Sequence, residues 1–159
     1  MERKELTKWL NIVISFAALT GVFLCFIVAP FLGLEMKFMY PEFGYMFWPC
    51  LIFVWVTAIP FYIGLYKGWL ICGEFAKDNS FCKENVQRLK DISKLALLEC
   101  ILYLVAMIIL LVLNLLHPSV LLMTLFIIFV GISVAVVAAT LSHLVEKARE
   151  LKEENDLTI

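Results

Sequence analysis

The side chain whose type and position best suit chemistry is Glu99, a single carboxylate inside a long apolar segment. An ionised carboxylate is costly in lipid, and there it usually faces a partner or a water-filled cavity. Lys67 closes the preceding apolar segment, and its long aliphatic stem allows the ammonium group to reach inward toward Glu99. Glu99 and Lys67 are therefore a candidate intramembrane polar site. It would be a proton- or ligand-responsive carboxylate, a structural pair, or a carboxyl group that is simply protonated.

No other group of reactive side chains has the spacing of a known site. The five cysteines are odd in number and include no Cys-x-x-Cys pair, so neither a zinc site nor a redox pair is indicated. His117 and His143 lie at opposite ends of one apolar segment and cannot share a metal ion. The sequence has no glycine-rich phosphate loop, Ser-His-Asp order or His-Glu-x-x-His motif. We therefore expect no catalytic residue, no metal and no cofactor, and a protein that is not an enzyme.

The composition predicts that membrane-spanning helices position these residues. Hydrophobic residues make up 63% of the chain and charged residues 17%, against roughly half and a quarter in soluble domains. About 20 helical residues cross a hydrocarbon core of about 30 Å, and four apolar runs are long enough: 9–34, 43–66, 95–116 and 118–143. Backbone amides in lipid must be bonded within their own segment, so these runs are helices. Residues 1–159 thus form one all-α integral membrane domain, a four-transmembrane-helix bundle.

The basic residues predict how the chain is oriented. Of the 13 lysine and arginine side chains, all but Lys37 precede the first run, lie between the second and third, or follow the fourth. Basic residues remain on the cytoplasmic side, which places both termini, the loop 67–94 and the tail 144–159 in the cytoplasm. The first run is longer than the apolar core of a signal peptide. We therefore expect it to be retained as a membrane span.

Two helices are predicted to extend into the cytoplasm. Phe81 and Val86 have the spacing of a hydrophobic staple around a helix that starts with Cys82 as its N-cap, and apolar positions lead from there into the third span. After the fourth span, Leu144 and Leu151 belong to an amphipathic stripe. We expect this stripe to pack on the start of the third helix, which the short turn after residue 116 brings nearby.

Two short segments carry a family resemblance. The segment 81–89 reads FCKENVQRL and the segment 153–159 reads EENDLTI. In these segments and in its four-span layout, the chain resembles the bacterial family catalogued as domain of unknown function 2975 (DUF2975). That family usually has serine where this chain has Cys82, and a thiol caps a helix less well than a hydroxyl. Either Ser80 caps instead, or the helix start is looser. The resemblance implies a multi-pass protein of the bacterial plasma membrane and supplies no catalytic residues.

Small residues repeat every four positions in the first and fourth spans. The repeats are Ala17, Gly21 and Cys25, and Gly131, Ala135 and Ala139. Such faces allow helix backbones to approach closely, and van der Waals contact then drives association in lipid. We predict that spans one and four pack through these faces, within one chain or between copies. The alternative is the ordinary small-residue content of a membrane helix.

These features favour a noncatalytic membrane protein that acts through partner proteins, as a regulator, sensor or anchor. Acidic residues are mixed with the basic ones in the loop 67–94, which argues against nucleic-acid binding. A small transporter or channel, with Glu99 in its path, is an alternative that requires a homo-oligomer. Immunity against a membrane-active peptide is another. The candidate cytoplasmic surface for a membrane or cytoplasmic partner comprises Glu84, Asn85, Arg88, Leu144, Leu151, Asn155 and Asp156.

Overall fold

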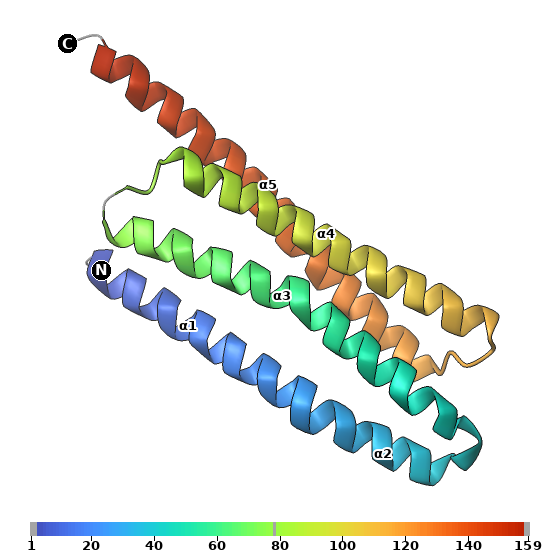
Figure 1. Cartoon of the computed structure of the whole chain (residues 1–159). Helices are drawn as coiled ribbons and strands as arrows, with labels where there is room; N and C mark the ends of the chain where they lie inside the picture. Colours follow the sequence, from blue (N-terminus) through green and yellow to red (C-terminus); the bar gives the residue numbers. More distant parts are fainter. Residues whose placement is uncertain (1–2, 78, 158–159) are drawn as a thin grey trace.

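The computed structural model describes the backbone of residues 3–77 and 79–157, and this part of the chain is helical and contains no strand. The first three elements, which follow one another without a break, form a single rod (Figure 1). In chain order the elements are α1 (Arg3–Phe23), the π-helix η1 (Leu24–Val28), α2 (Ala29–Met39), the 3-10 helix η2 (Pro41–Met46), α3 (Phe47–Ala76), α4 (Lys83–Val112) and α5 (Pro118–Leu157).

Four helical segments are long and apolar enough to cross a membrane. They are Glu5–Met39, Pro41–Ala76, Lys83–Val112 and Pro118–Asn155. Large apolar side chains remain exposed along all four, for example Phe16 at 70% and Phe129 at 68%. Apolar surface of this extent is not stable in water, so lipid must cover it. The predicted all-α class with four membrane-length helices is confirmed.

The helices pack in chain order as an open bundle. α1 lies against α3, α3 against α4, and α4 against α5. The interface between α4 and α5 is the most extensive of the three. Within the described residues, the backbone of α1 does not approach α4 or α5, and that of α3 does not approach α5. Figure 1 shows the start of α1, the α3–α4 connection and the end of α5 at one end of the molecule, called here the charged end. The α2–α3 and α4–α5 connections lie at the other, called here the turn end.

The π-helix exists because of a proline inside the first membrane-spanning rod. The Ala29 N–H reaches back five residues to the Leu24 carbonyl, and Pro30 has no N–H to offer. The Cys25 carbonyl is therefore left without a donor in its own helix. The indole Nε1 of Trp55 on α3 donates to this oxygen at 3.1 Å, and the Trp55 ring stacks on Phe26. A donor from the neighbouring helix thus supplies the hydrogen bond to this carbonyl that lipid cannot provide.

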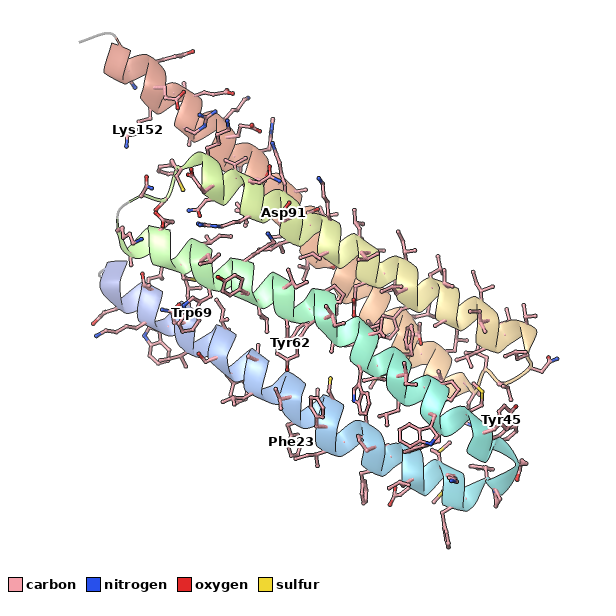
Figure 2. The ribbon with its side chains drawn as sticks, in the orientation of Figure 1. Phe23, Tyr45, Tyr62, Trp69, Asp91 and Lys152 are labelled. Atoms are coloured by element: carbon pink, nitrogen blue, oxygen red, sulfur yellow. The ribbon has the colours of Figure 1, made fainter. Side chains whose placement is uncertain are left out.

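A second bond of the same kind lies two turns further along the interface of α1 and α3. The Tyr62 hydroxyl donates to the Ala18 carbonyl at 2.9 Å, and Figure 2 shows Tyr62 between the two helices. Trp55 and Tyr62 are seven residues apart, as are their acceptors Cys25 and Ala18. Residues at this spacing lie on one face of a helix. The two side chains therefore tie antiparallel helices together at two levels.

Asn114 ends α4 four residues earlier than the apolar run predicts. Its φ of 55° is left-handed, a conformation that asparagine tolerates better than most residues. Its N–H bonds to the Leu111 carbonyl, and the Leu115 N–H bonds to the Leu110 carbonyl. This pair of bonds is a Schellman motif, which satisfies the last carbonyls of the helix. The apolar residues 113–116 therefore belong to the connection that turns the chain into α5.

The start of α4 agrees with the prediction, although the thiol plays no part in it. Cys82 occupies the N-cap position and makes no side-chain capping bond. The Asn85 side-chain amide instead reaches back and donates to the Ser80 carbonyl at 3.2 Å. Val86 is buried, while Phe81 is half exposed. The asparagine of the FCKENVQRL segment therefore holds the α3–α4 connection that the poor cap would leave loose.

Replacing Trp55 by Phe tests the bond to the interrupted helix. The change keeps an aromatic ring but removes the donor, so we expect unfolding in detergent to require about 1–2 kcal/mol less. Trp48→Phe is the matched control, because Trp48 is 61% exposed. Pro30→Ala restores a backbone N–H that can bond within the helix. In that background, Trp55→Phe should therefore lower the free energy of unfolding by less. Equal costs in both backgrounds would refute this explanation of the π-helix.

Candidate functional site

Lys67 is paired with Asp91 rather than with Glu99. Its Nζ lies 2.8 Å from Asp91 Oδ2, and Gln87 Nε2 donates to Oδ1 of the same carboxylate. Asp91 lies two helical turns nearer the charged end than Glu99 does. The predicted pair of Lys67 and Glu99 is therefore not formed.

Glu99 keeps a buried oxygen without a partner. Its Oε2 is inaccessible and has no hydrogen bond within the described residues. Tyr103 follows one turn later on α4, and its hydroxyl lies 3.4 Å from the hydroxyl of Thr57 on α3, which is 2% exposed. Because this oxygen is inaccessible, a donor or cation from outside the chain reaches it only if the neighbouring side chains move. A functional role for Glu99 stays a prediction.

The small-residue face of α1 is a packing face, but it packs on α3. A methyl group at Gly21 would lie 2.7 Å from the Tyr62 hydroxyl and 3.0 Å from the Phe61 ring. The glycine thus makes room for the aromatic side chains that reach across from α3. Because α1 and α5 are separated by two helices, the prediction that spans one and four pack within one chain is wrong. Packing of these faces between copies is untested.

The small-residue face of α5 packs on α4. A methyl group at Gly131 would lie 2.5 Å from the Sγ of Cys100, and the Ser93 hydroxyl donates to the Ala135 carbonyl at 2.9 Å. The face continues through the buried residues Ala138 and Ser142, whereas Ala139 is exposed. Steps of three and four residues follow a period of 3.6, and a repeat of four drifts off the face. Ala138 therefore takes the place predicted for Ala139.

Two residues of the predicted partner surface serve the fold instead. Asn85 is only 2% exposed. Its side-chain oxygen accepts a bond from Arg88 Nη1 at 2.8 Å, and that nitrogen also lies 3.5 Å from the Leu70 carbonyl on α3. Their hydrogen bonds join α3, the connection and α4. Asn85 is therefore too deeply buried to meet a partner, while Glu84 beside it is exposed.

The last turns of α5 extend beyond the start of α4 (Figure 1). Lys90 of α4 and Glu146 of α5 form an ion pair at 3.1 Å. Leu144 is 56% exposed and Leu151 is 61% exposed, so the prediction that this stripe packs on the third helix is wrong. Both leucines lie about 160–180° around α5 from Ser142, which faces α4. Asn155 is exposed, and the side chain of Asp156 lies outside the described residues.

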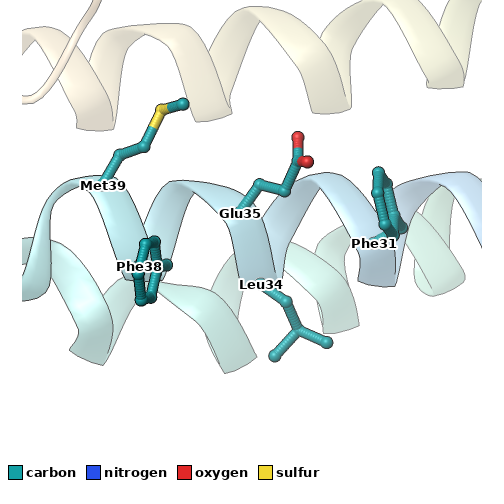
Figure 3. A pocket seen from close by; sticks show the side chains of 5 residues that line it. All are labelled: Phe31, Leu34, Glu35, Phe38 and Met39. Atoms are coloured by element: carbon teal, nitrogen blue, oxygen red, sulfur yellow. The ribbon is translucent and has the colours of Figure 1, made fainter.

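Two hollows lie at the turn end. The smaller, about 320 Å³, is formed by α2 alone, with Phe31, Leu34, Glu35, Phe38 and Met39 around it (Figure 3). A hollow along a single helix does not enclose a ligand. The larger, about 630 Å³, lies between two parts of the bundle: α2, η2 and α3 on one side, and the α4–α5 connection on the other. Its volume is typical of a small-molecule site.

Sequence reasoning missed the residues that make these interfaces and the larger hollow. In the sequence, Trp55 and Tyr62 are only two aromatic residues seven positions apart, in the span that follows the one containing Pro30. Ser93 carried no signal, because its partner lies on another helix. Lys37 stood out only as the single basic residue outside the segments predicted to be cytoplasmic. The arrangement therefore offers three places for function: the unpaired oxygen of Glu99, the end of α5, and the hollow at the turn end.

Four apolar helices of membrane length and a polar charged end define an all-α, multi-pass membrane protein. A model of the family described as Protein of unknown function (DUF2975) matches residues 31–159. The chain is also 30% identical over 155 residues to the uncharacterized membrane protein YoaS of Bacillus subtilis (strain 168). The aligned residues cover 96% of this chain and 97% of the relative. The chain belongs to the DUF2975 family, and the predicted resemblance is confirmed. No solved structure matches significantly.

Replacing Gly131 by Ile tests the close approach of α4 and α5. The side chain would collide with Cys100, so we expect the protein to lose about 1–3 kcal/mol of stability in detergent. Gly64→Ile is the matched control, because nothing lies within 4 Å of a methyl group there. Gly131→Ala should cost less when Cys100→Ala removes the sulfur atom. Equal stability of the Gly131 and Gly64 variants would contradict this packing.

Proposed function

We propose that this chain is a noncatalytic protein of the bacterial plasma membrane, with both termini in the cytoplasm, and that it acts by binding another protein. The end of α5 is the contact surface. The observation that carries the proposal is that Leu144 and Leu151 are more than half exposed on one face of α5, whose last turns extend beyond the start of α4. The excess of basic residues at the charged end supports the orientation.

The charges around these leucines argue for a protein partner rather than lipid. Lys147, Glu150, Lys152 and Glu154 accompany them on the extension, so the segment carries both signs of charge and no continuous apolar run. α5 is also one unbroken helix from Pro118 to Leu157, and its end therefore continues away from the membrane. An amphipathic helix with leucines seven residues apart is suited to a groove in another protein.

Site-specific photocrosslinking in native membranes tests this contact. We expect a photoreactive residue at Leu144 or at Leu151 to give the same heterologous adduct. Glu153 lies on the opposite face of α5 and forms an ion pair with Arg149, so the same probe there should give little of that adduct. Leu151→Lys should weaken the adduct formed from position 144, because it places a charge in an apolar contact.

Three results would count against the proposal. One is the same adduct from positions 151 and 153, which would indicate nonspecific capture. Another is an adduct of the chain only with itself, which would favour a homo-oligomer. A third concerns orientation: a membrane-impermeant maleimide should modify Cys82 of the α3–α4 connection only after the cells are lysed. Modification of Cys82 in intact cells would reverse the proposed topology.

A small oligomeric transporter is the second candidate, and the unpartnered oxygen of Glu99 favours it. The open bundle encloses no path by itself, so α1 or α5 of neighbouring copies would have to complete one. Glu99→Gln keeps the size and polarity of the side chain. If the partner-binding proposal holds, this variant should fold, remain a monomer in mild detergent and give the same crosslink from Leu151. A wild-type oligomer that Glu99→Gln disassembles would favour the transporter.

A further inference from the structure

The larger hollow at the turn end has one wall from each half of the bundle. Gly33 and Phe47 contribute from α2 and α3, and Leu110 and Leu116 contribute from the end of α4 and the connection to α5. No backbone approach joins α2 to α4 or α5 in the described residues. The space of about 630 Å³ therefore remains between the two helix pairs. Because it lies where the apolar spans end, it is at the level of lipid headgroups.

The lining combines an apolar wall with a single cation. Met46, Phe47, Leu110 and Leu115 are among the apolar side chains, and Lys37 is the basic residue of the lining. The Lys37 stem lies along Gly44, where a methyl group would be 3.4 Å from its Cγ and 3.5 Å from its Cε. A methyl group at this position would meet the stem only at ordinary van der Waals distance, so the Lys37 stem runs beside Gly44 of η2.

The charge of Lys37 is not neutralised within the described residues. Four ion pairs at the charged end engage Lys67, Lys77, Lys90 and Arg149, while no such bond involves Lys37. Two carboxylates are near it in the sequence. Glu35 lines the other hollow on α2, and Glu42 belongs to η2 without lining this one. A cation beside apolar surface that lacks a carboxylate partner favours an anionic ligand.

Two further polar groups line the same hollow. His117 Nδ1 accepts the Ser119 backbone N–H at 3.4 Å and lies 2.8 Å from the Ser119 hydroxyl. In the neutral ring this arrangement places the hydrogen on Nε2, which can then donate to a ligand. The exposed side chain of Asn114 supplies an amide donor from the left-handed turn. One cation and two neutral donors suit a phosphate group.

We propose that this hollow binds an anionic phospholipid, with its phosphate at Lys37 and one acyl chain along the apolar wall. The wall argues against a free soluble anion, which would gain nothing from Phe47 or Leu110. The unpaired ammonium argues against a zwitterionic lipid, whose choline would meet a like charge. Basic pockets between membrane helices bind lipid headgroups by this combination of charge and apolar contact. The site is independent of the partner surface on α5.

Native mass spectrometry of the purified full chain in neutral detergent tests the charge requirement. At equal concentrations, we expect dioleoylphosphatidylglycerol to remain bound about tenfold more than dioleoylphosphatidylcholine. Lys37→Gln should abolish this preference, as loss of one charge-assisted contact implies, and Lys37→Arg should keep it. Lys37 is exposed, so its replacement should not affect folding. Lys77→Gln at the charged end is the matched control and should leave the preference unchanged.

A native thiol reports the position of the lipid. Cys50 lines the hollow, whereas Cys82 lies at the charged end. We expect phosphatidylglycerol to slow maleimide labelling of Cys50 several-fold in the wild type and not in Lys37→Gln, with Cys82 unaffected in both. Equal retention of the two lipids, or labelling of Cys50 that does not respond, would overturn the proposal. Lys37-dependent binding of oleate without phosphatidylglycerol would overturn it in favour of a free fatty acid.

Discussion

Lipid offers no hydrogen bond to a peptide group, and this constraint shapes the first half of the molecule. Pro30 interrupts the bonding of the first span, and the chain responds with a π-helix that leaves the Cys25 carbonyl without a donor. Trp55 provides the missing bond, and Tyr62 repeats the contact two turns away at Ala18. Because α3 is the helix that packs beside α1 in the described part of the chain, these bonds also help to fix the position of α1. The proline thus makes α1 dependent on the aromatic face of α3.

In the second half of the molecule, the helices associate through small residues rather than through aromatic side chains. α4 and α5 approach closely because Gly131, Ala135 and Ala138 leave room, and Ser93 then reaches a carbonyl across the interface. The small residues occupy one side of α5, and α4 covers that side. Its opposite side, on which Leu144 and Leu151 are more than half exposed, has no neighbouring helix among the described residues. The same choice of residues therefore produces both the tightest interface and the surface that we assign to a partner.

Charge is used differently at the two ends of the bundle. At the charged end, Lys67 pairs with Asp91, Lys90 pairs with Glu146, and Arg88 bonds to the buried Asn85. These contacts join α3, α4 and α5, so Lys67, Lys90 and Arg88 have structural partners. Lys37 at the turn end has no such partner in the described part of the chain and lines an open hollow. At the charged end, basic side chains thus pair with groups of the chain itself, whereas Lys37 at the turn end is available to an anionic ligand.

The sequence by itself determined the four spans, the family and the start of α4 after Cys82, because apolar length and local motifs act within one segment. It also indicated that Gly21 and Gly131 lie on packing faces. It did not identify their partners, because small residues fit any close neighbour. The place of Ala138 rather than Ala139 follows from the 3.6-residue helical period and needed no tertiary information. Lys67 pairs with Asp91 rather than with Glu99, and this choice depends on how α3 and α4 are aligned. Only the tertiary structure fixes that alignment, through contacts between residues far apart in the chain, and it alone left Leu151 and Lys37 uncovered.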